Sequence, residues 1–203
     1  MQQLNEQFIF DLKSNMKKGV LLINLGTPDS PGNADVRKYL TQFLNDPRVI
    51  DISPVGRFLL VNGIIVPFRA SNSAKLYKQI WTAEGSPLLV NSTKMKIALQ
   101  KELGDEYVVE LGMRYQSPSL ETALDKLKKE QVSEIIILPL YPQYAASATA
   151  TVCDATFSAL QQTRNMPALR TIKHFHDDAG YIKATAQNIR DYWTLHGRPD
   201  KLV

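Results

Sequence analysis

The sequence predicts an α/β fold in which helices flank a parallel sheet. Two apolar runs, Gly19–Leu25 and Ile135–Leu140, lack the alternation of a half-exposed strand and are typical of strands covered on both faces. Stretches with helical spacing of apolar residues separate these runs from further strand-like segments. At 203 residues, the chain can form one large domain, or one domain and the start of another.

The first part of the chain predicts a strand, a helix and a second strand. Gly19–Leu25 is the first strand, and Gly26–Thr27–Pro28 stops it. We expect Asn45–Asp46–Pro47 to end the helix that follows, and a short strand over Val49–Ile52. The core face of that helix carries apolar residues at helical spacing, namely Val36, Tyr39, Leu40 and Phe43.

Residues 55–68 form an unusually apolar segment, which is too short to span a bilayer. From the sequence alone, this segment either packs in the core or forms the lip of an apolar pocket and a membrane-facing patch. Both interpretations stay open at this stage.

The middle of the chain predicts a helix, a strand and a helix. Asn91–Leu103 forms the first of these, with Met95, Leu99 and Leu103 on one face. A strand over Tyr107–Met113 follows, and Ser117–Pro118 is typical of a helix start.

The last part predicts a helix over Val152–Thr163 and a strand over Leu169–Phe175. His174 and His176 alternate on that strand and could ligate a metal together, but without a third donor nearby we predict no metal ligand here. A final helix carries a shared face of Ile182, Ala186, Ile189 and Trp193.

Composition excludes several classes of function. Lys and Arg number 24 against 20 Asp and Glu, and this scattered excess of +4 does not indicate a nucleic-acid partner. A single cysteine, Cys153, excludes an internal disulfide and predicts a reducing, cytoplasmic compartment. We expect the Cys153 side chain to lie in the core of the protein. We interpret residues 1–18, which are polar, as an N-terminal extension.

Candidate ligand-contacting residues stand where three predicted strands end. Leu25 ends the first strand, Arg114–Tyr115 follow the strand at Tyr107–Met113, and Tyr141, Gln143 and Tyr144 follow Ile135–Leu140. In a parallel sheet, the carboxyl ends of strands form the crevice in which ligands bind. The alternative is that Tyr-Pro-Gln-Tyr is a turn whose two rings close the core. The glycines after the first strand do not predict a nucleotide site, because prolines interrupt them.

The sequence resembles the ferrochelatases over residues 18–203. Four motifs carry the resemblance, in the order Asn24-Leu25-Gly26-Thr27-Pro28, Gly85-Ser86-Pro87-Leu88, Met113-Arg114-Tyr115 and Leu138-Pro139-Leu140-Tyr141-Pro142-Gln143-Tyr144. The resemblance implies a flavodoxin-like or Rossmann-like class I chelatase lobe. The activity it implies is insertion of ferrous iron into a porphyrin in the last step or steps of haem biosynthesis.

The resemblance also implies which residues contact the porphyrin. Leu25 would face the porphyrin plane, where some relatives carry a tyrosine that ligates iron, and residues 55–68 would line the mouth of the pocket. The implied porphyrin-binding residues are Leu25, Arg69, Tyr77, Ser86, Arg114, Tyr115, Tyr141, Gln143 and Tyr144. No permanently bound cofactor is expected, and ferrous iron is a substrate. The implied partner is a dicarboxylic or tetracarboxylic porphyrin.

The resemblance predicts how the chain is divided. Residues 19–175 would form the first chelatase lobe, and residues 176–203 a connecting helix and the start of a second lobe. The catalytic histidine and its glutamate partner are expected beyond Val203, with none in this chain. The alternatives are a non-catalytic tetrapyrrole-binding lobe, a partner of a separate second lobe, and a small chelatase for another tetrapyrrole. The last of these would use histidines near the first strand, where this chain has none. The predicted location is cytoplasmic, with peripheral membrane contact through residues 55–68.

Overall fold

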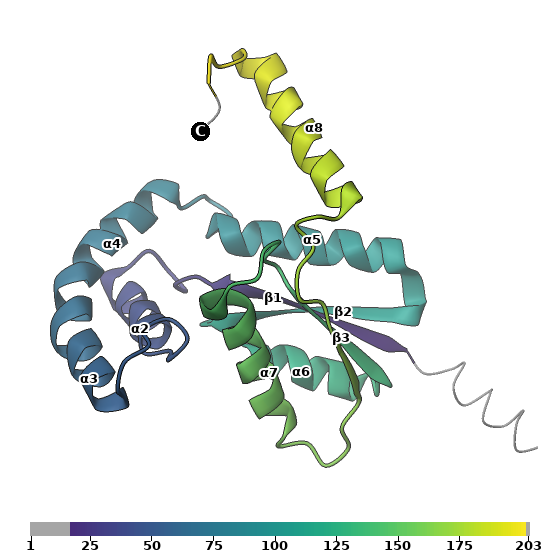
Figure 1. Cartoon of the computed structure of the whole chain (residues 1–203), viewed down its shortest axis with the longest axis horizontal. Coiled ribbons are helices and arrows are strands. Elements are labelled where there is room, and N and C mark those ends of the chain that lie inside the picture. Colours follow the sequence, from purple (N-terminus) through teal and green to yellow (C-terminus); the bar gives the residue numbers. More distant parts are fainter. Residues whose placement is uncertain (1–16, 202–203) are drawn as a thin grey trace, which may run out of the picture.

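The structure is a computed structural model that describes residues 17–201 (Figure 1). Its centre is a parallel sheet with strand order β2-β1-β3-β4. In this sheet Leu22 of β1 lies opposite Leu111 of β2 and Leu138 of β3. The strands span β1 Lys18–Gly26, β2 Tyr107–Tyr115, β3 Glu134–Pro139 and β4 Ala168–Thr171. The predicted α/β fold with a parallel sheet is confirmed.

Helices cover both faces of the sheet. On one face, Leu21 and Ile23 of β1 pack with α6 (Leu120–Lys129) and α7 (Thr151–Leu160). On the other face, neighbouring β1 residues pack with α5 (Pro87–Leu103). Successive strand residues point to opposite faces, so a strand covered twice is apolar throughout.

Three more helical elements lie beyond the carboxyl ends of the strands, together with α2 (Asn33–Leu44) (Figure 1). We call residues 54–80 the apolar arm, which consists of α3 (Pro54–Leu59), a π-helical turn η1 (Leu60–Ile65) and α4 (Val66–Ile80). The arm and α2 share a small core of their own, built on Val61, Val66 and Ala70.

Only one stripe of the arm is buried. Val61 is 0% exposed, whereas Phe58 is 61% and Phe68 is 76% exposed. The segment therefore has a core side and an exposed apolar side, and contact of the exposed side with a pocket or a membrane stays a prediction. Within residues 17–201, no helix combines the length and hydrophobicity needed to cross a membrane.

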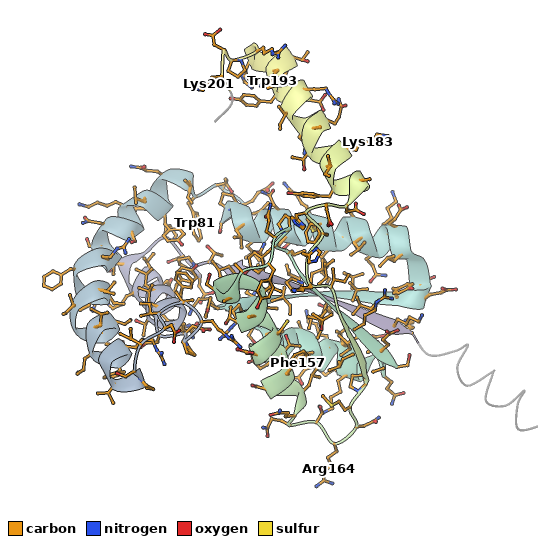
Figure 2. All side chains as sticks on the ribbon, viewed as in Figure 1. Trp81, Phe157, Arg164, Lys183, Trp193 and Lys201 are labelled. Carbon is orange, nitrogen blue, oxygen red and sulfur yellow. The ribbon has the colours of Figure 1, made fainter. Side chains whose placement is uncertain are left out.

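The last helix, α8 (Ala179–His196), follows β4 and projects away from the sheet. It has no buried residue, and Figure 2 shows its Lys183 and Trp193 side chains far from the strands. The predicted division at residue 175 precedes this helix and stays a prediction. Most of the predicted extension, residues 1–16, lies outside the described residues.

Two strand predictions are wrong in whole or in part. Val49–Ile52 form a turn, because the backbone N–H groups of Val49 and Ile50 donate to the Asp46 carbonyl. The strand predicted over Leu169–Phe175 ends at Thr171, so His174 and His176 lie in the connection to α8 and not on a strand.

Helix boundaries also differ from the predictions. The side chain of Ser119, not Ser117, caps α6 by accepting the N–H of Thr122. Helix α5 already begins at Pro87, and Met95, predicted on the same face as Leu99 and Leu103, is 49% exposed. Helix α7 ends at Leu160 instead of Thr163 and is preceded by a π-helical turn, η3 (Ala146–Ala150). A short 3-10 turn, η2 (Gly104–Glu106), joins α5 to β2. Cys153, which we expected in the core, is half-buried on α7.

Candidate functional site

Three of the predicted site positions meet at one edge of the sheet. Leu25, Tyr115 and Tyr141 stand at or just beyond the carboxyl ends of β1, β2 and β3, which are adjacent and parallel. The N–H of Leu140 donates to the Ile23 carbonyl at 2.8 Å and holds the chain beside β1 up to Tyr141. The expectation that these three strand ends lie side by side is confirmed, whereas a common crevice for a ligand stays a prediction.

Gly26 allows the ends of β1 and β2 to approach closely. It pairs with Tyr115 across the sheet, and its φ of +106° is a conformation that favours glycine. A Cβ atom here would lie 1.9 Å from the Tyr115 carbonyl oxygen. The glycine of the Asn-Leu-Gly-Thr-Pro motif is therefore required by the geometry of this edge.

A buried carboxylate fixes the end of β2. We call Asp46, Arg114, Tyr115 and Thr151 the Asp46 clamp. The Tyr115 hydroxyl donates to Asp46 Oδ2 at 2.9 Å, and the Thr151 hydroxyl and the Arg114 guanidinium donate to the same oxygen. Arg114 Nε also donates to Thr151 Oγ1 at 2.7 Å. The clamp thus ties the loop after α2 and the start of α7 to the predicted site.

The clamp keeps Asp46 ionised. Its side chain is 2% exposed, and this burial would by itself raise the pKa. Hydrogen bonds from Thr151, the Arg48 N–H and Tyr115, together with the Arg114 charge, outweigh burial and lower the pKa below its ordinary value of 3.8. Arg114 is therefore paired with a carboxylate of the chain itself, and its contact with a porphyrin stays a prediction.

Aromatic rings connect this edge with the apolar arm. The Tyr39 ring lies 6.4 Å from Tyr115 and 6.2 Å from Tyr77, both edge-on. Trp81, labelled in Figure 2 at the end of α4, lies 6.5 Å from Tyr77. Phe43 completes the group at 5.5 Å from Tyr115. Two predicted site residues, Tyr77 and Tyr115, are therefore joined through Tyr39.

The phenols at this edge are neutral at physiological pH. Burial raises the pKa of Tyr115 to about 12, and it raises the pKa of Tyr39, Tyr77 and Tyr141 as well. The Tyr141 hydroxyl is buried and has no hydrogen-bond partner within residues 17–201. A neutral O–H without a partner at a ligand edge is suited to bonding a polar group of a ligand.

The remaining predicted residues occupy different places. Ser86 is buried at the start of α5, where it is the N-cap residue. Gln143 and Tyr144 are exposed in the loop after β3. Arg69 is exposed on α4 and forms no ion pair in the part of the chain that the structure describes. Within residues 17–201, no hydrogen bond or ion pair joins these residues to the Asp46 clamp.

Sequence reasoning missed Asp46, Tyr39 and Thr151. Asp46 had been interpreted as part of a helix stop and Tyr39 as part of a core face. An acidic residue before a proline is common in turns, so the sequence carries no signal for a buried ion pair. The only hint was Arg114, a cation directly after a predicted buried strand, which needs a partner when it is partly buried.

The fold defines an α/β lobe of the class whose ligands bind at the carboxyl ends of parallel strands. Residues 17–203 match the model of the family described as Ferrochelatase. The chain therefore belongs to the ferrochelatase family.

Similar proteins have the same family name. The chain is 50% identical over 191 residues to a ferrochelatase from Chromobacterium violaceum. This alignment covers 92% of this chain and 52% of the relative. It is 47% identical to ferrochelatases from Nitrosomonas europaea and Methylobacillus flagellatus, with 92% of this chain and 52% and 56% of those relatives covered. The chain thus spans about half the length of the curated relatives it matches.

Proposed function

We propose that this chain forms one wall of the porphyrin pocket of a ferrochelatase, which inserts ferrous iron into a porphyrin in haem biosynthesis. The observation that carries the proposal is the position of Leu25, Tyr115 and Tyr141, which come from three separate family motifs and stand at adjacent strand ends. Ligands of parallel α/β folds bind at this edge. The names of the relatives in three bacteria support the same reaction.

The chemistry of the edge suits a flat apolar ring that carries carboxylates. Leu25 and the exposed side of the apolar arm offer apolar contact, and Leu25 has no atom that could ligate iron. Because Arg114 is paired with Asp46, we assign recognition of a porphyrin carboxylate to Arg69. Gln143, Tyr144 and the Tyr141 hydroxyl would contribute hydrogen bonds, as would Tyr77 on α4 and Ser86 at the start of α5.

In this proposal the chain binds and orients the porphyrin, and proton transfer takes place elsewhere. Metal insertion requires a base for the two pyrrole N–H protons. The phenols of this edge stay protonated near neutral pH and so do not accept a proton, since burial raises the pKa of Tyr115 to about 12. We therefore assign the base for this step to none of the phenols at this edge.

Porphyrin binding tests the proposal directly. We expect the purified chain to quench or shift the fluorescence of a dicarboxylic porphyrin, and Arg69→Gln to weaken binding roughly tenfold, as expected for loss of a charge-assisted contact. Arg164→Gln is the matched control, because Arg164 is exposed in a loop far from the strand ends (Figure 2). Comparing a tetracarboxylic porphyrin would identify the substrate class. Equal effects of the two substitutions would contradict the assignment of Arg69.

We further propose that the protein is cytoplasmic and that the apolar arm contacts a membrane surface peripherally. Residues 52–83 contain no acidic residue, and beside the exposed apolar side chains they carry four basic ones, Arg57, Arg69, Lys75 and Lys78. This combination suits anionic lipid.

Sedimentation with lipid vesicles tests this contact. We expect binding to anionic vesicles and weaker binding to neutral ones. Phe68→Ser should reduce binding, whereas Phe157→Ser on α7 should not, although Phe157 is also 40% exposed (Figure 2). Binding that does not depend on Phe68 would contradict a membrane role for the arm.

A further inference from the structure

The connection between β4 and α8 brings together three groups that can ligate a metal. His174, His176 and Asp177 each offer one ligand atom, and these atoms all lie within 4.8 Å of one another. The Nδ1 atoms of His174 and His176 face the same carboxylate oxygen, Asp177 Oδ1, at 3.6 and 3.4 Å. The imidazole rings meet edge-on, with 5.0 Å between their centroids.

These separations fit a bound ion. Histidine nitrogen and carboxylate oxygen ligands lie about 2.0–2.2 Å from Zn²⁺ and similar ions, which places tetrahedral ligand atoms roughly 3.4 Å apart. The two distances to Asp177 Oδ1, 3.6 and 3.4 Å, are close to this spacing. Small side-chain movements would therefore complete a three-ligand site and leave further coordination positions open.

The donor set favours a transition metal. Two imidazoles and one carboxylate suit Zn²⁺, Fe²⁺ and Co²⁺, and this combination with open positions is the set used by many Fe²⁺ enzymes. Mg²⁺ and Ca²⁺ prefer oxygen ligands alone. The sequence suggested two histidines without a third donor, and the structure supplies Asp177.

The loop that carries these residues is anchored at both ends. The Phe175 N–H donates to the Pro142 carbonyl at 2.9 Å, and the Phe175 ring packs on Tyr181 at 5.3 Å. Asp178 caps α8 by accepting the Tyr181 N–H at 2.9 Å. Because anchored ligands lose less freedom on binding, the loop is preorganised for an ion.

The same anchors place the group beside the proposed porphyrin wall. Pro142 belongs to the Tyr-Pro-Gln-Tyr motif, and Lys173 Nζ lies 5.2 Å from the centre of the Tyr144 ring. His174 and His176 have side chains that are 42% and 45% exposed. An ion can therefore enter from solvent and leave again close to the pocket.

We propose that His174, His176 and Asp177 form a binding site for a divalent transition-metal ion at the rim of the porphyrin site. Its natural occupant is ferrous iron, held as cargo before insertion. The assignment of iron as cargo rests on the proposed function, whereas the metal site itself stands on the geometry of the three residues.

Cobalt titration of the whole 203-residue chain tests the site, because the visible absorption of Co²⁺ reports its ligands. We expect one bound ion, and a loss of affinity of roughly tenfold or more in His174→Ala, His176→Ala and Asp177→Asn, as ligand losses usually cost at least as much as losses of their supporting residues. Anaerobic Fe²⁺ should compete with Co²⁺. His196→Ala is the control, since His196 lies at the far end of α8 against Tyr192.

The outcomes separate the site from the proposed function. Unchanged Co²⁺ binding in all three variants, or an equal loss in His196→Ala, would overturn the site. Porphyrin binding should be unchanged in Asp177→Asn. If the chain binds Co²⁺ through these residues but binds no porphyrin, the proposed function fails and the role of iron as cargo fails with it, while the metal site stands.

Discussion

Strand β1 and the apolar arm contain similarly apolar stretches but lie in opposite environments. Leu21, Leu22 and Ile23 of β1 are all 0% exposed, whereas Phe58 and Phe68 of the arm are 61% and 76% exposed. The strand lies between two neighbouring strands and has helices on both faces. Only one side of the arm packs into a small core.

This difference separates the apolar residues that stabilise the fold from those that we propose contact a ligand or a membrane. In β1 they stabilise the fold, because their burial removes them from water on both faces of the sheet. In the arm, only the stripe with Val61 does so, and the exposed rings are free to contact a ligand or membrane. Changes in the sheet should therefore affect stability, and changes on the outer side of the arm should affect binding.

The largest expected effect of a single change is that of Gly26→Ala. The new Cβ would lie 1.9 Å from the Tyr115 carbonyl oxygen at a φ of +106°, and we expect a loss of about 4 kcal/mol or more in the free energy of unfolding. Gly63→Ala in the arm is the control, since nothing lies within 4 Å of its Cβ position. That variant should gain about 0.5–1 kcal/mol. Urea denaturation measures both, and similar values would contradict the comparison.

Removal of the carboxylate in Asp46→Ala should be the next largest effect. It leaves Arg114, Tyr115 and Thr151 without their shared acceptor, and we expect a loss of about 3 kcal/mol in the free energy of unfolding. Asp154→Ala is the control, because its ion pair with Arg48 is exposed and should contribute little. Thermal unfolding at neutral pH would detect both effects, and a loss in Asp154→Ala as large as in Asp46→Ala would argue against the clamp.

The Asp46 clamp also predicts the response to acid. The folded-state pKa of Asp46 is lower than its ordinary value of 3.8. Its stabilising contribution is therefore fully present well above pH 3.8 and is lost as the pH falls through the folded-state pKa. Denaturant midpoints measured between pH 6 and 2 should fall less steeply below pH 4 in Asp46→Asn than in the unchanged chain. Identical slopes would show that another group controls acid unfolding.

The smallest effects distinguish the two sides of the arm. Val61→Ala removes methyl groups from a side chain that is 0% exposed and should cost about 2 kcal/mol of unfolding free energy. Phe68→Ser changes a side chain that is 76% exposed and should alter stability by less than about 0.5 kcal/mol. If Phe68→Ser were as destabilising as Val61→Ala, the outer side of the arm would be part of the core and not a binding surface.

The sequence predicted the sheet well because buried parallel strands are continuous apolar runs. Strands β1, β2 and β3 were expected close to their observed bounds, and the convergence of Leu25, Tyr115 and Tyr141 follows from that arrangement. The strand predicted at Val49–Ile52 is a turn instead, since the Asp46 carbonyl accepts two N–H groups there.

Other features depend on contacts between distant parts of the chain. Asp46 meets Arg114 and Thr151, which lie 68 and 105 residues further along, and no local pattern indicates such partners. Similarly, the sequence left open which side of the arm is buried. The role of each predicted porphyrin-binding residue stays a prediction, and Arg69→Gln tests the one assigned to a porphyrin carboxylate.

The most direct test of the central claim is a porphyrin titration of the 203-residue chain, with zinc insertion followed in the same samples. Our account predicts porphyrin binding that weakens in Arg69→Gln, without appreciable metal insertion by this chain alone. Failure to bind porphyrin under conditions in which the chain is folded would contradict the proposal that the carboxyl edge of this sheet is a porphyrin wall. Rapid insertion would contradict the proposal that this chain binds and orients the porphyrin without supplying the base for the pyrrole protons.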